Sequence, residues 1–146
     1  MKKKLKALVL GAGAIGRGYI PWELKNFDIS FYDSNRDLVS RMEKQGNYTT
    51  FMSCGDRLEE MKVYFNFITS DINKVLEEKY DIVFCCVGPR NISKLPSEIG
   101  SIDCPIYSLE NDPETVIELR DLLNKENIYF GGVHGVNKNN ENYYIY

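Results

Sequence analysis

An apolar segment of strand length that runs directly into a glycine-rich turn constrains this chain more than any other feature. Residues 5–10 read LKALVL, and residues 11–16 follow at once with GAGAIG, the pattern G-x-G-x-x-G. Strand, tight turn and helix N-terminus in this order bring free backbone N–H groups to the positive end of a helix dipole. The segment therefore predicts a site for an anionic ligand at the start of the first helix.

Each glycine of this pattern has its own physical task. Gly11 lets the chain reverse sharply, and Gly13 lacks a Cβ and so lets the backbone approach a pyrophosphate. Gly16 lets the following helix lie close to the sheet. The pattern alone also fits an ordinary glycine-rich turn, so the prediction depends on a second feature.

That second feature is the acidic residue Asp33. Residues 29–32 read as a second strand that ends at Asp33, about 20 residues beyond the glycines, where an acid that binds the adenosine ribose is expected. A carboxylate there accepts hydrogen bonds from both ribose hydroxyls and repels a 2′-phosphate, which favours NAD over NADP. Asn35 and Arg36, just past Asp33, could contact the adenine side of the cofactor, although a surface turn explains them equally well.

Length and composition predict one globular domain. The chain has 146 residues, of which 43% are hydrophobic and 27% are charged. A formal net charge of −3 gives no basic field, so we expect no nucleic-acid partner. The apolar segment after the N-terminal lysines is too short for a signal peptide, and no segment approaches the ~20 apolar residues of a membrane span. We therefore expect a cytoplasmic protein without a membrane partner.

The cysteines predict neither a disulfide framework nor a metal site. Cys54, Cys85, Cys86 and Cys104 show no C-x-x-C spacing, and the acidic residues offer no ligand pattern either. Cys85 and Cys86 are neighbours in an apolar strand, so their side chains should point to opposite faces and be buried as small hydrophobic groups.

Alternating strand and helix patterns predict an α/β fold of the Rossmann-like, doubly wound type, with a mainly parallel sheet. Residues 48–52 and 61–65 are β-prone, and the segment between them is turn-like. This pattern predicts a β-hairpin inserted before the third strand. The expected domain covers residues 1–136; residues 137–146 form a tail or the start of a linker, with a possible short strand at 143–146. Strands are expected at 5–10, 29–32, 66–69, 81–87, 105–109 and 127–130, and helices at 14–26, 36–44, 71–76, 92–99 and 113–123.

Several strand ends bring polar residues to the edge of the sheet where ligands bind in such folds. The fourth strand ends in residues 88–91, and the fifth in residues 110–112. The single histidine, His134, follows the sixth strand, where a base with a pKa near neutral would be useful; a loop histidine without a role is the alternative. Glu110 is more readily explained as a positioning acceptor than as a base.

Four motifs together resemble the N-terminal domain of the mannitol-1-phosphate 5-dehydrogenases, within the polyol-specific long-chain dehydrogenase family. They are residues 11–20 (GAGAIGRGYI), 31–35 (FYDSN), 87–89 (VGP) and 110–111 (EN). The resemblance implies that Asp33 holds the adenosine ribose of NAD, that Val87, Gly88 and Pro89 lie along the cofactor, and that Glu110 and Asn111 approach the nicotinamide. It also implies that a pyrophosphate is held by Gly11, Gly13, Ala14, Ile15, Gly16 and Arg17.

The chain also departs from that family. Pro21 falls in the first helix where the family usually has a small residue, and the tail from Val133 onward differs. The resemblance further implies that the catalytic lysine and most sugar-binding groups lie in a second, helical domain, which we do not expect within these 146 residues. The sequence then fits a fragment of a dehydrogenase, a free-standing binding protein or one part of a split enzyme. We therefore expect the NAD(H)-binding part of a polyol-phosphate dehydrogenase; the alternative is a stand-alone NAD(H)-binding or redox-sensing module without turnover.

Overall fold

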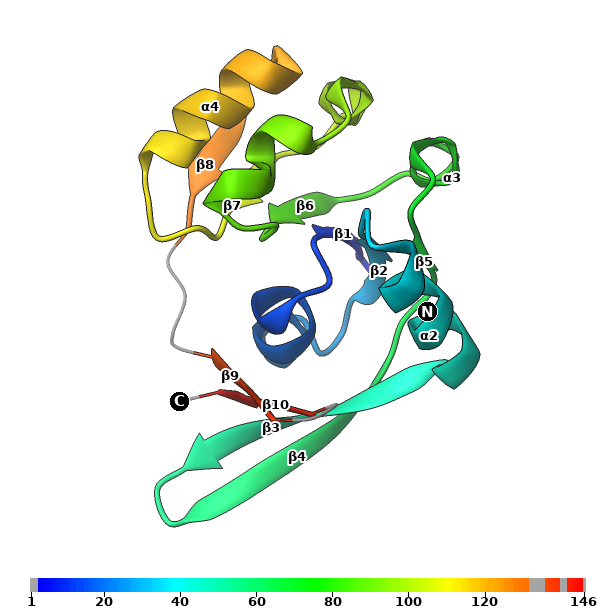
Figure 1. Cartoon of the computed structure of the whole chain (residues 1–146), viewed down its shortest axis with the longest axis vertical. Helices are drawn as coiled ribbons and strands as arrows, with labels where there is room; N and C mark the ends of the chain where they lie inside the picture. Colours follow the sequence, from blue (N-terminus) through cyan, green and yellow to red (C-terminus); the bar gives the residue numbers. More distant parts are fainter. Residues whose placement is uncertain (1–2, 132–135, 140–141, 146) are drawn as a thin grey trace.

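A computed structural model describes residues 3–131, 136–139 and 142–145. Its main sheet has six parallel strands in the order β5-β2-β1-β6-β7-β8 (Figure 1). The chain starts in the centre at β1, moves outward to β5, and then returns to the other side of β1. This reversal is the doubly wound arrangement, which confirms the predicted fold class. The strands are β1 (Lys6–Leu10), β2 (Asp28–Tyr32), β5 (Ile68–Thr69), β6 (Ile82–Cys85), β7 (Ile106–Ser108) and β8 (Ile128–Phe130).

Both faces of this sheet are covered, because its strands are apolar on both sides. Leu8 and Leu10 of β1 belong to one hydrophobic core, and Val9 between them belongs to the other. The same alternation separates Cys85 from Cys86, which are buried in different cores as predicted. The first core is covered by α3 (Ile72–Leu76), α4 (Glu114–Leu123) and two 3₁₀ segments, η2 (Pro89–Lys94) and η3 (Ser97–Ser101). The predicted single helix over 92–99 is therefore wrong, because Pro96 separates two short turns.

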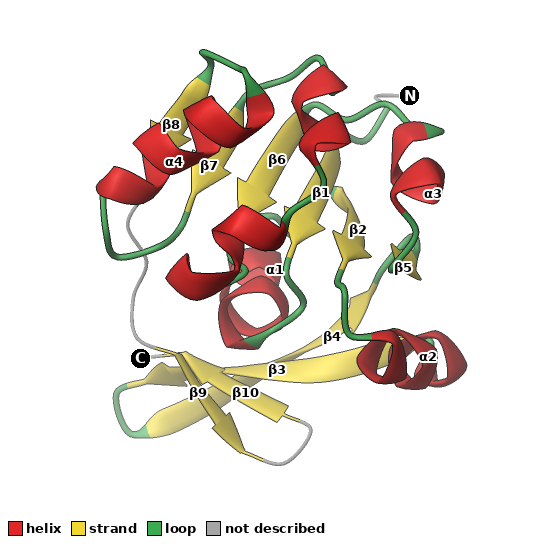
Figure 2. Ribbon diagram, turned by 45° about the horizontal axis from the view of Figure 1, so that its top comes forward, coloured by secondary structure: helices red, strands yellow, loops and turns green. Residues whose placement is uncertain are grey.

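The second face is covered by α2 (Arg36–Gln45), by the segment after the glycine turn, and by a second sheet. The hairpin of β3 (Asn47–Cys54) and β4 (Arg57–Tyr64) was predicted, and both strands are longer than expected. Strand β10 (Asn142–Ile145) pairs parallel to β3, and β9 (Val136–Asn139) pairs antiparallel to β10 (Figure 2).

The segment 137–142 was expected as a turn or linker, and the structure corrects this, because part of it forms β9. Its Asn- and Lys-rich composition is typical of a turn, and the partner that makes it a strand is distant in sequence. Strand β10 agrees with the short strand expected near the end of the chain. The domain boundary at residue 136 stays a prediction.

The expected helix over residues 14–26 is also corrected. A π-helical turn, η1 (Ala14–Tyr19), is followed by a single turn of α-helix, α1 (Ile20–Glu23), with Pro21 in the first turn of α1. Figure 1 shows this coil, in blue, between the main sheet and the second sheet. A helix tolerates proline at this position, because the N–H groups of the first turn have no acceptor within the helix.

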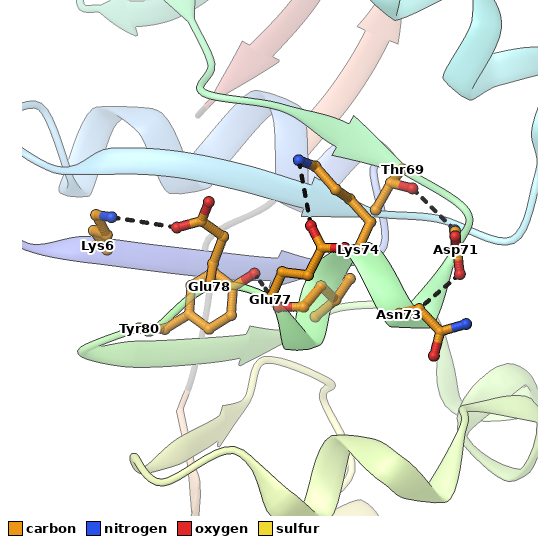
Figure 3. A network of polar contacts seen from close by, with 9 residues as sticks. Lys6, Thr69, Asp71, Asn73, Lys74, Glu77, Glu78 and Tyr80 are labelled. Carbon is orange, nitrogen blue, oxygen red and sulfur yellow. Dashed lines mark hydrogen bonds and ion pairs between the residues drawn. The ribbon is translucent and has the colours of Figure 1, made fainter.

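Local capping interactions define the short helices. Asn35 caps α2 by accepting a hydrogen bond from the backbone N–H of Leu38 at 3.1 Å. Around α3, Asp71 accepts from the N–H of Asn73 at 2.9 Å (Figure 3). An ion pair of 3.4 Å between Lys6 Nζ and Glu78 connects the end of this helix to β1. Among the described residues, no helix has the length and apolar character needed to cross a bilayer.

Candidate dinucleotide site

A pocket of about 300 Å³ opens at the carboxyl edge of the main sheet, beside the point where the strand order reverses between β1 and β6. Open α/β sheets bind their ligands at this position. Three segments that are distant in sequence meet here: the glycine turn after β1, the end of β2, and the loop after β6. The lining residues are Gly11, Gly13, Tyr32, Asp33, Ser34, Asn35, Cys86, Val87, Asn91, Lys94 and Leu95.

The three glycines of the turn have different surroundings. Gly11 has φ +99°, and a Cβ there would lie 2.6 Å from the carbonyl oxygen of Cys86, so this position requires glycine. A Cβ on Gly16 would overlap the carbonyl oxygen of Gly11, because η1 lies directly against the turn. Gly13 differs from both, since a Cβ there would meet no atom within 4 Å. The space beside Gly13, which lines the pocket, is thus open, and the sequence predicts a pyrophosphate there.

Asp33 lies at the end of β2 and contacts the glycine turn. Its Oδ2 accepts a hydrogen bond from the N–H of Ala12 at 2.8 Å, and its Oδ1 accepts one from the N–H of Asn35, also at 2.8 Å. Each carboxylate oxygen retains a second lone pair for a further donor. Asp33 therefore both holds the turn and presents acceptor sites to the pocket.

The loop after β6 is held in one conformation by side chains. Gly88 has φ +92°, and its N–H donates to Oε1 of Glu110 at 2.9 Å. Asn91 closes the loop by donating from Nδ2 to the carbonyl oxygen of Val87 at 2.8 Å. Burial raises the pKa of the Glu110 carboxyl, and the hydrogen bond from Gly88 partly offsets this rise. Glu110 thus positions the loop that the resemblance places along the cofactor.

The remaining predicted residues do not line the pocket. Ala14, Ile15 and Arg17 are in η1, directly after the turn, and Pro89 begins η2. Asn111 is exposed in the loop after β7. His134 lies outside the described residues.

Sequence reasoning missed part of the pocket wall. Tyr32, Ser34 and Cys86 line the pocket and are sequence neighbours of the predicted residues Asp33 and Val87, so their place in the pocket wall could have been predicted. Lys94 and Leu95 had no such signal, because only the tight η2 turn brings them back over the sheet edge. Burial raises the pKa of the Cys85 thiol below this wall to about 12, which disfavours the thiolate.

The strand order, the glycine turn and the pocket at the reversal point together define a Rossmann-type dinucleotide-binding domain. Comparison with protein-family models finds no match. Relatives are found among curated sequences, and they share one description.

The mannitol-1-phosphate 5-dehydrogenase of Phaeosphaeria nodorum is 28% identical over 137 residues, which cover 89% of this chain and 35% of that protein. The enzyme of the same name from Halalkalibacterium halodurans is 32% identical over 102 residues, 66% of this chain and 27% of that protein. The chain is therefore similar to the N-terminal part of mannitol-1-phosphate 5-dehydrogenases, which confirms the predicted resemblance. It spans about a third of the length of these relatives.

Solved structures agree on the fold. Octopine dehydrogenase, solved with NADH and L-arginine, superposes with a TM-score of 0.79 at 14% identity, over 97% of this chain and 39% of that one. A probable 2-dehydropantoate 2-reductase from Bacillus subtilis gives a TM-score of 0.67 at 17% identity, over 97% and 46%. The match to 97% of this chain means that the second sheet is largely included in the similarity.

Proposed function

We propose that this chain is the NAD(H)-binding domain of an oxidoreductase that acts on a polyol or sugar-alcohol phosphate. The observation that carries the proposal is the pocket at the reversal point, which joins the open space at Gly13 to the carboxylate of Asp33. The sequence similarity to mannitol-1-phosphate 5-dehydrogenases supports the substrate class, and the NADH complex of octopine dehydrogenase supports the cofactor.

In this proposal each part of the pocket binds one part of the cofactor. The backbone N–H groups at the start of η1 bind the pyrophosphate beside Gly13. The carboxylate of Asp33 accepts hydrogen bonds from the adenosine ribose, and its negative charge disfavours the 2′-phosphate of NADP. Val87, Gly88 and Pro89 lie along the nicotinamide half, with Asn111 at its far end. Bound NAD accepts a hydride from an alcohol carbon, and the chain supplies orientation and electrostatics.

The groups that bind the sugar phosphate and take the alcohol proton are proposed to lie in a helical domain of the kind expected from the resemblance. The relatives are about three times as long as the matched region, which leaves room for such a domain. Asn111 has no basic side-chain group, and one oxygen of the Glu110 carboxylate accepts from the N–H of Gly88, so we assign Glu110 to positioning the loop after β6. The chain therefore binds and orients the cofactor, and proton transfer falls to other residues.

A fluorescence titration with NADH tests this function. We expect the wild-type chain to bind NADH, and Gly13→Val to bind it much more weakly, because a branched side chain fills the space beside the turn. Lys62→Val is the matched control, since it places an exposed valine on β4, away from the pocket. Absence of NADH binding by the folded wild-type chain, or equal affinity of the wild type and Gly13→Val, would contradict the proposal.

A further inference from the structure

The π-helical turn η1 directly follows the glycine turn, and a proline lies four residues beyond Arg17. In α-helical register the carbonyl oxygen of Arg17 would pair with the nitrogen of residue 21. Residue 21 is proline, which has no N–H, so this bond is unavailable. Buried carbonyl oxygens in proteins are almost always hydrogen-bonded, and a side-chain donor can take the place of the N–H that proline lacks.

Strand β3 supplies that group. The hydroxyl of Tyr48 donates to the carbonyl oxygen of Arg17 at 2.8 Å, across 31 residues of sequence. Two positions further along the same face of β3, Oγ1 of Thr50 donates to the carbonyl oxygen of Gly18 at 2.9 Å. Tyr48 is 4% exposed and Thr50 is fully buried, so the bond from Thr50 is buried and the bond from Tyr48 is partly shielded from water.

We call the hydrogen bonds from Tyr48 and Thr50 to the carbonyl groups of Arg17 and Gly18 the β3–η1 contact. A third hydrogen bond adjoins it. The indole N–H of Trp22 in α1 donates to Oγ1 of Thr50 at 3.2 Å. Thr50 therefore accepts from the segment after the π turn and donates to the turn itself. Burial also raises the pKa of Tyr48, so its hydroxyl remains a donor across the whole physiological pH range.

The β3–η1 contact holds the turn from the side opposite the main sheet. On the sheet side, Gly16 lies against the carbonyl group of Gly11, where no Cβ fits. Within the turn, the N–H of Arg17 donates to the carbonyl oxygen of Gly13 at 3.0 Å. The direction of the N–H groups at the start of η1 thus depends on both sides of this arrangement.

We propose that Tyr48 and Thr50 are positioning residues of the dinucleotide site: through the carbonyl groups of Arg17 and Gly18 they hold η1 so that its first N–H groups face the pyrophosphate. The inference rests on the proposed function. It assigns to the inserted hairpin a role in cofactor binding, although none of its residues lines the pocket.

The test measures NADH affinity at a temperature at which circular dichroism shows every variant folded. Tyr48→Phe and Thr50→Val should each weaken NADH binding roughly 3- to 10-fold, the range that one net hydrogen bond is worth. Thr50→Ser keeps the hydroxyl and should restore most of the affinity. The matched controls are Tyr64→Phe, exposed on β4, and Thr49→Val, on the other face of β3; both should bind as the wild type does.

If Tyr48→Phe does not fold, the comparison of Thr50→Val with Thr50→Ser carries the test.

The outcomes separate the two proposals. A wild-type chain that does not bind NADH overturns the proposed function. A wild-type chain that binds NADH, with unchanged affinity in Tyr48→Phe and Thr50→Val, overturns only the positioning role, even where the variants unfold at lower temperature.

Discussion

Asp33 Oδ2 and the backbone nitrogen of Ala12 lie 2.8 Å apart, which makes the acid at the end of β2 a structural partner of the glycine turn. Parallel pairing of β1 with β2 explains this contact, because it brings the carboxyl ends of both strands together. One carboxylate therefore has two tasks: it fixes the turn, and it presents its remaining lone pairs to the pocket. Substitutions of Asp33 have to be designed so that these tasks are separated.

Asp33→Asn keeps a side-chain acceptor for the N–H of Ala12, replaces the acceptor for the N–H of Asn35 by an NH₂ group, and removes the negative charge. We expect the wild-type chain to prefer NADH over NADPH, and Asp33→Asn to reduce that preference roughly tenfold, because the repulsion of the 2′-phosphate disappears. Parallel fluorescence titrations with both cofactors measure the effect. A wild-type chain that binds NADPH as tightly as NADH would refute the role of Asp33, as would an unaltered preference in Asp33→Asn.

The glycines of the turn allow packing and ligand binding to be distinguished. Gly16→Ala should lower the free energy of unfolding by about 1–3 kcal/mol, because its Cβ would overlap the carbonyl oxygen of Gly11. Gly13→Ala meets no atom within 4 Å and should leave stability nearly unchanged while it weakens NADH binding. Urea unfolding together with NADH titration of both variants checks this. Equal losses of stability in the two variants would contradict the assignment.

Glu110 should give the protein a recognisable pH dependence. Its pKa is raised by burial, so the folded state binds its proton more tightly than the unfolded state does. The stability that this proton contributes is present below the ordinary carboxyl range and is lost as the pH rises through the raised pKa. Glu110→Gln should remove this decline and keep the acceptor for Gly88, so that at pH 7 it is at least as stable as the wild type.

The comparison of Glu110→Gln with Glu110→Ala provides the control for this prediction. Alanine removes the acceptor and leaves the N–H of Gly88 without it, which should cost about 1–3 kcal/mol of unfolding free energy. Urea unfolding between pH 4 and pH 8 measures all three proteins. Identical pH slopes for the wild type and Glu110→Gln would show that the carboxyl group does not titrate as described.

Local patterns were enough to predict much of the fold. The strand before Gly11, the cap at Asn35 and the helix after Pro113 each carry their own signal within a few residues, and the structure has all three. The alternation of strands and helices along the chain then predicted the parallel sheet. The hairpin of β3 and β4 was predicted for the same reason, since both strands and their turn are contiguous.

The features that were missed depend on partners far apart in sequence. The π form of η1 is accompanied by hydrogen bonds from Tyr48 and Thr50, which lie 31 and 32 residues beyond the carbonyl groups that they contact. Strand β9 forms only beside β10, which itself pairs with β3. Similarly, the bond from Gly88 to Glu110 joins the ends of two neighbouring strands, and neither sequence segment indicates the other. In each case tertiary pairing outweighs the local pattern.

The chain alone, supplied with NAD and a hexitol phosphate, should bind cofactor without measurable dehydrogenation. A placed general base alone contributes on the order of 10²–10⁴-fold to such a rate, and orientation of the substrate contributes more. Spectrophotometric detection of NADH at 340 nm checks this. Steady NADH production that is abolished by His134→Ala would overturn the prediction and make His134 the catalytic base.

The most direct test of the central claim is a ¹⁵N–¹H correlation spectrum of the wild-type chain titrated with NAD. The proposal predicts that amide shifts concentrate at Gly13 and η1, at residues 33–35, and at residues 87–91, the segments that surround the pocket at the reversal of strand order. Shifts confined to other parts of the sheet, or a spectrum unchanged at millimolar NAD, would contradict it.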